Sequence, residues 1–329
     1  MTDSLQPTKS SRGEWRHTLA VVALLVLSGS ILTGCGGPQG VEFIARSDLP
    51  SADSVRWSRT NAALFLVNSS EMSFGFEPST RVFILNRMNG QRRPVASTSG
   101  EFIFAQTWSP DGREVVLQIP RGASGYENYQ GLWIWNSDTG SLEYLAAKGI
   151  AVWSPDGRQI AIVEDTVSTG RQTLRLIDRF SGEEQTSDLA SSSEVGYVAG
   201  ADWSPDGKRL ALAIGNSAAS IPLKLYQYEL SSHQLLLLVN SQASQPAWSP
   251  DGDKMAYVEQ GSNSRLDRLH IFSIPRQCEL TLSQLGSAWS PSWSPDGKKL
   301  AYVGNDGIYA VDLEAFLTAY DPTESCLKF

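Results

Sequence analysis

The sequence predicts an all-β protein, a six-bladed β-propeller whose blades are four-stranded antiparallel sheets, and three observations lead to this prediction. The segment Trp-Ser-Pro-Asp-Gly occurs five times, beginning at Trp108, Trp153, Trp203, Trp248 and Trp293. The intervals between these tryptophans are 45, 50, 45 and 45 residues. Each copy is followed by short strand-like runs that are separated by turn signals. A repeat of this length, built from several short strands, is typical of a propeller.

The repeated segment has the composition of a tight turn that leads into a buried strand. Proline presets φ for the second position of a turn, aspartate bonds nearby backbone amides, and glycine takes the positive φ that closes the turn. The strand that follows is apolar on both faces, as in Leu210, Ala211 and Leu212. A strand of this kind lies between two packed sheets, as the inner strands of a propeller do.

A sixth copy that lacks Pro-Asp-Gly begins at Trp57, in the run Trp57-Ser58-Arg59-Thr60-Asn61. Asn61 can adopt the left-handed conformation that glycine adopts in the other turns. Leu64, Phe65 and Leu66 are expected to occupy the same register as the apolar strands of the other copies. The count of predicted blades is therefore six.

The last unit has no fourth strand of its own. Its second and third strands are expected at Lys299–Val303 and Gly307–Val311, and an irregular tail follows Asp312. The strand-like run Val41–Ser47 precedes the first unit. We expect this N-terminal strand to complete the last blade, because that arrangement joins the chain ends and removes an open sheet edge.

The N-terminal segment has the order of features that is typical of a secretory signal peptide. Residues 1–17 are polar and carry Lys9, Arg12 and Arg16, whereas residues 18–32 are almost wholly apolar. Small residues then precede Cys35. The run Leu32-Thr33-Gly34-Cys35 resembles the lipobox of bacterial lipoproteins, in which the cysteine is acylated and becomes the new N terminus. The alternative is an uncleaved membrane anchor that contains an incidental cysteine.

These features predict the organisation of the chain. Residues 1–34 are expected to be a lipoprotein signal peptide, and residues 35–40 the acylated Cys35 with a short linker. Residues 41–329 are expected to form one six-bladed propeller with a short C-terminal tail. The formal net charge of −8 argues against a nucleic-acid partner, which would need clustered Lys and Arg. We therefore expect a monomer that contacts the membrane through its lipid anchor.

Two cysteines remain besides Cys35. An exported protein is exposed to oxidising conditions, so Cys278 and Cys326 are candidates for one disulfide bond. The alternative is two separately buried thiols. Neither cysteine has the spacing of a metal-binding motif, so we expect no metal site and no cofactor.

The repeat also carries a family resemblance. The turn followed by an apolar-Ala-apolar strand, as in residues 203–214 and 293–303, resembles the TolB-type β-propeller repeat of bacterial envelope proteins. The resemblance covers about residues 41–316. It implies the fold but not the function, because this propeller serves as a scaffold, as a binding protein and as the gating domain of peptidases. The chain differs from TolB itself, which has an additional N-terminal α/β domain and no lipid anchor.

No catalytic residue is expected. The chain has no Gly-x-Ser-x-Gly segment, and His233 and His270 are not beside a serine or cysteine that could act as a nucleophile. Turn formation accounts for the repeated aspartates, which are distributed around the ring instead of converging on one ion. These aspartates are Asp111, Asp156, Asp206, Asp251 and Asp296. The repeated tryptophans are expected to pack in the core between blades.

Two long loops between second and third strands are the candidate binding surface. One carries Phe74 and Phe76, and the other carries Tyr126 and Tyr129. Aromatic side chains on loops of a rigid scaffold make good interface anchors. The alternative is that the loops bind nothing. These loops are expected on the face opposite the Ser-Pro-Asp-Gly turns, whereas the N-terminal strand starts on the turn-bearing face and holds that face near the membrane.

The sequence thus predicts a non-catalytic envelope lipoprotein, a binding or scaffold module for an envelope protein or peptide. It is expected to be exported and lipid-anchored to the bacterial cell membrane or outer membrane, facing the periplasm or the exterior. The alternative is an enzyme or sensor that binds a small or sugar-like ligand in the central channel. That alternative needs inward-facing carboxylates or histidines on the first strands, and stretches such as Val198–Asp202 offer few.

Overall fold

The computed structural model describes residues 38–46, 51–61, 63–71, 79–99, 103–121, 123, 125–126, 128–166, 171–189, 197–216, 221–261 and 267–320. The chain divides into two units, Met1–Gly36 and Gly37–Phe329, and all described residues belong to the second unit. Among these residues, no helix has the length and apolar character needed to cross a bilayer. The predicted signal peptide, Cys35, Phe74, Phe76 and Cys326 lie outside the described residues.

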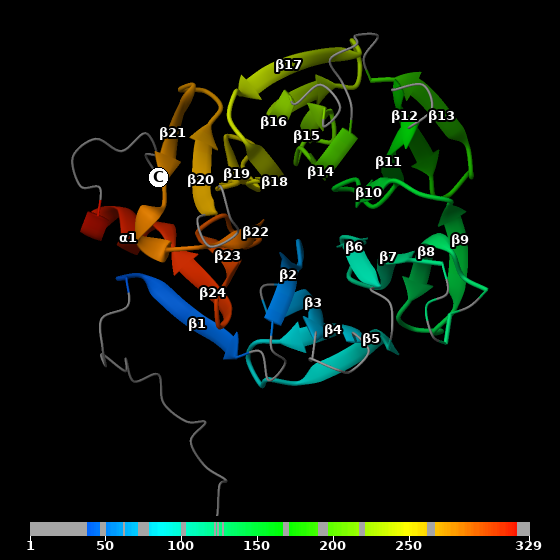
Figure 1. The fold of residues 1–329 in the computed structure, drawn as a ribbon, viewed down its shortest axis with the longest axis horizontal. Helices are drawn as coiled ribbons and strands as arrows, with labels where there is room; N and C mark the ends of the chain where they lie inside the picture. The colour runs from blue at the N-terminus through cyan, green and yellow to red at the C-terminus, as the bar shows by residue number, and fades with distance from the viewer. Residues whose placement is uncertain are drawn as a thin grey trace, which may run out of the picture. The chain divides into compact units, whose positions relative to one another are not determined.

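Six four-stranded antiparallel sheets form the blades of a propeller, as predicted (Figure 1). Blade 1 consists of β2 (Ser51–Trp57), β3 (Leu64–Glu71), β4 (Ser79–Asn86) and β5 (Arg92–Ser99). Blade 2 consists of β6 (Phe104–Trp108), β7 (Glu114–Ile119), β8 (Gly131–Asn136) and β9 (Leu142–Ala146). Blade 3 consists of β10 (Ile150–Trp153), β11 (Gln159–Thr166), β12 (Arg171–Asp178) and β13 (Glu184–Asp188).

The remaining blades complete the ring. Blade 4 consists of β14 (Tyr197–Trp203), β15 (Arg209–Asn216), β16 (Ile221–Glu229) and β17 (Gln234–Val239). Blade 5 consists of β18 (Ala243–Trp248), β19 (Lys254–Glu259), β20 (Arg268–Ser273) and β21 (Cys278–Thr281), followed by the 3₁₀ turn η2 (Ser283–Leu285). Blade 6 consists of β22 (Trp289–Trp293), β23 (Lys299–Gly304) and β24 (Gly307–Asp312) together with β1 (Val41–Arg46).

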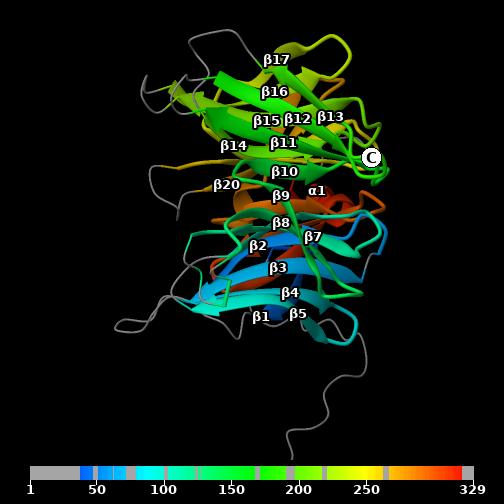
Figure 2. The same ribbon diagram turned by 90° about the vertical axis from the view of Figure 1, so that its right-hand side faces the viewer.

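The core lies between neighbouring blades. The first strand of each blade lies nearest the centre of the ring, and in side view the strands run from one face of the ring toward the other (Figures 1 and 2). The second strands are buried on both faces, as their composition predicts. Their central residues, Val116, Ala161, Ala211, Ala256 and Ala301, are all 0% exposed. The repeated tryptophans are also buried, and Trp203 is 0% exposed.

Hydrogen bonds within each turn explain why Ser-Pro-Asp-Gly recurs. In blade 3 the Ser154 hydroxyl donates to Asp156 Oδ1 at 2.6 Å and accepts from the Gln159 amide at 2.8 Å. The Arg158 amide donates to the same carboxylate at 3.0 Å. The Ser154 hydroxyl first, and then this amide, hold the pKa of Asp156 below its usual value. The structural role predicted for this aspartate is consistent with these bonds.

Two expectations for the first blade are wrong. Trp57 pairs with Phe65, whereas Trp108 pairs with the residue seven positions later, Val115, so the strand after Trp57 is shifted by one residue. The cause is a turn that is one residue longer, since the Ser58 amide bonds the carbonyl of Leu64 at 2.9 Å. Asn61 is not among the described residues with positive φ. Its side chain instead accepts the Ala63 amide at 2.9 Å and closes the turn.

The N-terminal strand completes blade 6, as predicted. β1 pairs antiparallel with β24, beginning with Val41 opposite Val311. The chain that precedes β1 is bound to the C-terminal part of the protein, because the Gln39 amide donates to the Tyr320 hydroxyl at 2.8 Å. Gly40 has a φ of +78° and packs so tightly that a Cβ atom there would lie 3.0 Å from the Phe316 amide nitrogen. The linker predicted before Val41 is thus held against the fold at Gln39 and Gly40.

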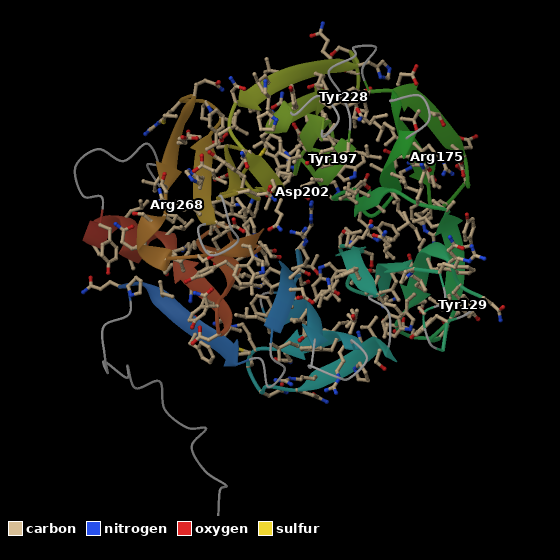
Figure 3. All side chains as sticks on the ribbon, viewed as in Figure 1. Tyr129, Arg175, Tyr197, Asp202, Tyr228 and Arg268 are labelled. Carbon is tan, nitrogen blue, oxygen red and sulfur yellow. The ribbon has the colours of Figure 1, made fainter. Side chains whose placement is uncertain are left out.

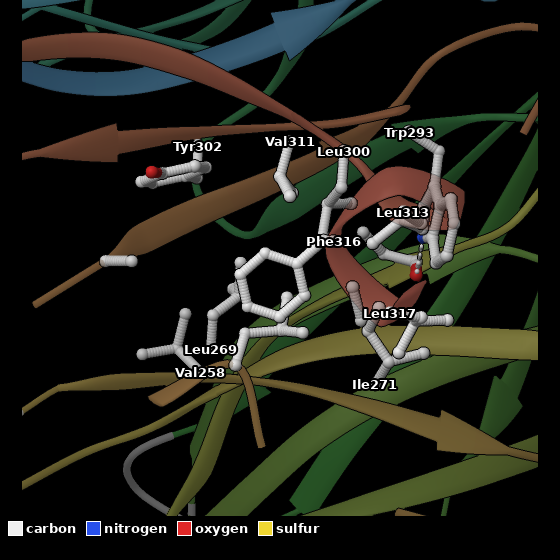
Figure 4. Packing of buried hydrophobic residues seen from close by; sticks show 14 residues of the cluster. Val258, Leu269, Ile271, Trp293, Leu300, Tyr302, Val311, Leu313, Phe316 and Leu317 are labelled. Atoms are coloured by element: carbon white, nitrogen blue, oxygen red, sulfur yellow. Dashed lines mark hydrogen bonds between the residues drawn. The ribbon is translucent and has the colours of Figure 1, made fainter. Parts of the chain in front are cut away.

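The residues after Asp312 are not irregular, as had been expected, but begin with the helix α1 (Leu313–Tyr320). Leu313, Phe316 and Leu317 lie on one face of this helix and are buried. Figure 4 shows Phe316 among side chains of blades 5 and 6, including Leu269 and Val311. The helix therefore seals the junction between blade 5 and the closed blade 6.

Cys278 begins β21, directly after the turn between the third and fourth strands of blade 5. It is a disulfide-bonded cysteine. Since Cys326 lies outside the described residues, its pairing with Cys278 stays a prediction. We expect peptide mapping without reductant to recover one peptide pair that joins Cys278 to Cys326, and reduction to lower the free energy of unfolding by about 2–4 kcal/mol. Recovery of both cysteines as free thiols, or of Cys278 joined to Cys35, would contradict this prediction.

Candidate binding cavity at the centre of the ring

A cavity of about 260 Å³ lies where the first strands meet the repeated turns. Two sets of equivalent residues, which the repeat places around the axis, line it. The tryptophans are Trp57, Trp108, Trp203, Trp248 and Trp293. The prolines are Pro110, Pro155, Pro205, Pro250 and Pro295 of the turns. Tryptophans that the sequence assigned only to the core therefore also line the cavity.

The residue that precedes each of the six repeat tryptophans also lines the cavity. These residues are Arg56, Thr107, Val152, Asp202, Ala247 and Ser292. Side chains alternate along a strand, so the residue before a tryptophan that packs between blades faces the axis instead. Four of the six are uncharged, and the two charged residues are Arg56 and Asp202. The charged groups at this position therefore come from blades 1 and 4.

An ion pair crosses the cavity between these two blades, which lie opposite one another in the ring (Figure 1). Arg59 Nη2 lies 2.9 Å from Asp202 Oδ1, and the two side chains are 36% and 21% exposed. Figure 3 places Asp202 near the centre of the ring. Arg59 occupies the position at which the other turns have proline, and the longer turn of blade 1 allows it to extend over the cavity. The neighbouring Thr60 hydroxyl donates to the carbonyl of Pro110 at 2.7 Å, which fixes this turn to blade 2.

Arg56 is enclosed by protein, although the cavity leaves part of its side chain accessible. Burial lowers the pKa of its guanidinium, while the charge of Asp202 opposes this effect and that of Arg59 adds to it. Its described hydrogen bond is to a neutral acceptor, the carbonyl of Pro291, at 3.3 Å. Among the described residues, no carboxylate forms an ion pair with Arg56. The cavity thus contains a guanidinium whose charge is only weakly compensated.

Hydrogen bonds between blades hold the cavity wall in place. The second oxygen of Asp202 accepts the Trp248 amide at 2.7 Å, and the Ser292 hydroxyl accepts the Trp57 amide at 2.7 Å. These amides belong to first strands, which have no neighbouring strand on the axial side, so a side chain of another blade satisfies them. Asp202 therefore has both oxygens engaged. The cavity is a rigid site whose charged groups are held by the fold.

Comparisons with known proteins agree with this architecture. No protein-family model and no curated protein sequence matches the chain. Among solved structures, TolB from Acinetobacter baumannii matches with a TM-score of 0.53 and 20% identity over 70% of this chain, which spans 59% of that protein. A protein assigned as TolB from Agrobacterium tumefaciens matches with a TM-score of 0.55 and 18% identity over 84% of this chain and 99% of that one. The fold is that of the TolB-type six-bladed β-propeller. Hydrazine synthase of Kuenenia stuttgartiensis matches with a TM-score of 0.53 and 14% identity over 82% of this chain and 98% of that one, so the fold is shared by proteins of different function.

The two histidines of this TolB-type propeller both lie away from the cavity lining. His270 is 5% exposed on β20, stacks on Tyr257, and has its Nε2 atom 3.2 Å from Glu259. Burial lowers the pKa of His270, and the charge of Glu259 opposes this effect. His233 lies in a turn and bonds the buried Tyr228 hydroxyl at 2.8 Å through Nδ1. Within the part of the chain that the structure describes, no cluster of three or more His, Cys, Asp or Glu side chains could hold a metal ion.

Of the four aromatic residues that were predicted to form the binding surface, the structure describes Tyr126 and Tyr129. Both follow β7 in the TolB-type propeller. Tyr129 lies at the outer edge of the ring, far from Asp202 (Figure 3). Both tyrosines are half-buried against the core, and burial raises the pKa of Tyr126. Edge-to-face contacts continue from Tyr129 to Trp133, at 4.9 Å, and from Trp133 to Tyr144, at 5.2 Å. Tyr144 is 53% exposed, so these four residues form a partly exposed aromatic patch.

Proposed function

We propose that the protein is a non-catalytic binding protein of the bacterial cell envelope, which receives a segment of a protein partner in the central cavity. In this proposal the chain is exported, is acylated at Cys35, and is held at the surface of a membrane as a monomer. The fold supports the coarser part of this proposal, since a propeller is a rigid ring that presents a central site. The composition of the cavity supports the finer part, which is that the partner segment binds at the centre of the ring.

The observation that carries the proposal is the composition of the cavity. Its wall is built from the turn prolines, which are rigid and lose little conformational entropy on binding, and it is backed by buried tryptophans of the first strands. Arginines then provide the polar contacts. Hot spots of protein interfaces are enriched in arginine and lie in enclosed pockets of this kind.

The alternative of an enzyme with a sugar-like substrate has weaker support. Glycoside hydrolysis uses two carboxyl groups on either side of the bond that is cleaved. Asp202 is the one carboxylate among the described residues that line the cavity, and no histidine or cysteine is among them. Both oxygens of Asp202 accept hydrogen bonds from other blades. A base held in this way is poorly placed to accept a proton from a substrate.

Site-specific photo-crosslinking tests the proposal in the acylated full-length protein in its native envelope. A crosslinking residue at Thr60, at the rim of the cavity, is expected to give a discrete protein adduct, whereas the same residue at Phe180 is the matched control. Phe180 is 83% exposed in a turn outside the cavity lining and is expected to give no adduct. The Thr60 adduct should disappear when Thr107, inside the cavity, is replaced with tryptophan.

The aromatic patch of Tyr126, Tyr129, Trp133 and Tyr144 is a second candidate for the partner site, favoured by the exposure of Tyr144. Phe74 and Phe76, which lie outside the described residues, remain candidates for partner binding. A crosslinking residue at Tyr144 that gives the adduct, with none from Thr60, would move the site from the cavity to this patch and contradict the proposal.

A further inference from the structure

We propose that the cavity recognises a carboxylate of the partner segment, which takes the place of Asp202 on Arg59 and pairs with Arg56. This inference rests on the proposed function, because the cavity must first be the place where the segment binds. It adds the chemical group that is recognised and the residues that recognise it.

The charge balance of the cavity favours a singly charged anion. The described lining contains two guanidinium groups, those of Arg56 and Arg59, and one carboxylate, that of Asp202. The lining therefore has one uncompensated positive charge within a chain whose formal net charge is −8. A carboxylate brings one negative charge, whereas a phosphate monoester brings about 1.5 to 2 and would leave the cavity negative. Arginine also binds carboxylates through two parallel hydrogen bonds.

Arg56 has no carboxylate partner among the described residues, so a ligand carboxylate can pair with it. A buried charge is costly unless it is paired, and the described hydrogen bond of Arg56 is a 3.3 Å contact to a carbonyl oxygen. A ligand carboxylate would supply the missing negative charge. Fixed walls keep Arg56 facing the cavity, since Trp57 beside it is bonded to Ser292 and packs in the core.

The ion pair of Arg59 with Asp202 shows how a carboxylate would be held. The Arg59 guanidinium already binds a carboxylate, and this carboxylate belongs to the opposite blade. A partly exposed pair of this kind contributes little to stability, because solvent screens it in part. It can therefore be exchanged for an equivalent pair with a ligand at small cost. Asp202 remains bound to the Trp248 amide when Arg59 leaves it.

The asymmetry of the ring supports a dedicated role for blade 1. Five turns place proline at the rim of the cavity, and the sixth places Arg59 there in a turn that is one residue longer. The residue before the repeat tryptophan is likewise arginine in this blade, at Arg56. If packing alone determined the rim, the turn of blade 1 would need no arginine in place of proline. The position before the tryptophan varies from blade to blade, but in blade 1 it and the altered turn both bring positive charge to the same cavity.

Binding of short peptides to the purified protein tests this inference, with the fluorescence of the cavity tryptophans as the readout. The probes are an acetylated Leu-Glu-Leu amide, its Leu-Gln-Leu twin, Leu-Gln-Leu with a free C-terminal carboxylate, and inorganic phosphate. We expect the glutamate peptide to bind at least about tenfold more tightly than its glutamine twin, as one charged hydrogen-bonded pair provides. The affinity of the Leu-Gln-Leu peptide with a free C-terminal carboxylate shows whether a chain terminus can replace the glutamate side chain.

The variants make the test specific. Arg59→Gln and Arg56→Gln are each expected to remove the preference for the glutamate peptide. Asp202→Asn is expected to strengthen binding of that peptide by about threefold to tenfold, because it removes the competing carboxylate and keeps an acceptor for the Trp248 amide. Arg209→Gln is the matched control, since Arg209 lies over the Trp248 ring at 5.0 Å but is not part of the cavity lining, and it should leave the preference unchanged.

Several outcomes would overturn the inference. They are equal binding of the glutamate and glutamine peptides, tighter binding of phosphate than of either carboxylate, weaker binding by Asp202→Asn, and no carboxylate binding at concentrations up to about 10 mM. Failure of the proposed function is distinguishable, because the Thr60 crosslink reports on the cavity whatever group is recognised. If that crosslink forms equally in Arg59→Gln and in the parent protein, the cavity is the partner site and the carboxylate inference alone is wrong.

Discussion

Replacing Trp203 with alanine is expected to lower the free energy of unfolding by about 3–5 kcal/mol. Trp203 is 0% exposed, and its indole nitrogen donates to the carbonyl of Val152 in the preceding blade at 3.0 Å. The substitution removes the largest side chain of the cluster between blades 3 and 4 and leaves that carbonyl without its donor. Denaturant unfolding, followed by circular dichroism, measures the change.

Two further variants separate the contributions to this effect. Trp203→Phe keeps most of the apolar volume and loses the hydrogen bond, so about 1–2 kcal/mol is expected. Tyr144→Ala, at an aromatic residue that is 53% exposed, should change the free energy of unfolding by no more than about 0.5 kcal/mol. If Trp203→Ala costs less than the phenylalanine variant, the packing of this tryptophan between the blades does not stabilise the ring.

Replacing Cys35 with serine is expected to move nearly all of the protein out of the membrane fraction. A serine cannot accept the thioether-linked lipid. Membrane attachment is expected to depend on the acyl groups, because a protein with a net charge of −8 is not attracted to anionic lipids. Membrane fractionation at high salt and intact-mass measurement of the mature N terminus give the result. Gly34→Ala is the matched control, since it keeps a small residue before the cysteine and should leave acylation intact.

Retention of the Cys35→Ser protein in the membrane fraction, in a correctly processed form, would show that another part of the chain attaches it. The attachment would then have to be sought elsewhere, for example in residues 18–32. An unmodified Cys35 in the mature parent protein would equally contradict the assignment of a lipoprotein.

The blades could be predicted because one local signal specifies them. Ser-Pro-Asp-Gly fixes a turn through bonds within a few residues, and the apolar strand that follows can only be buried between sheets. The signal fails where it is incomplete. In the first copy Asn61 was expected to replace glycine, but the turn is one residue longer and Asn61 closes it through its side chain. The sequence pattern of that copy does not reveal the extra residue.

Helix α1 was missed although its signal is present. Leu313, Phe316 and Leu317 have the spacing of one helical face, but the helix has only eight residues and follows a long series of strands. Such a short helix gains its stability from packing against the blades and not from its own propensity. Its existence therefore depends on a junction that forms only in the closed ring.

The cavity could be predicted in part. The residue before each repeat tryptophan faces the axis, so the register alone identifies Arg56 and Asp202 as candidates for the channel. The ion pair of Asp202 with Arg59 could not be predicted, because blades 1 and 4 come together only across the completed ring. No spacing along the chain encodes that distance. The aromatic loops were easier to notice in the sequence, yet Tyr126 and Tyr129 are half-buried.

The pairing of β1 with β24 also determines the order in which the protein can be completed. β1 is among the first strands to be synthesised, and its partner strand is among the last, since Val41 pairs with Val311. A contact between residues so distant in sequence forms late, because a long loop must close before it is made. Until then β1 and β24 both expose unpaired edges, which are sites of aggregation. A chain that stops before Gly307 would lack the partner of β1 altogether, so interrupted synthesis leaves an open ring with a free first strand.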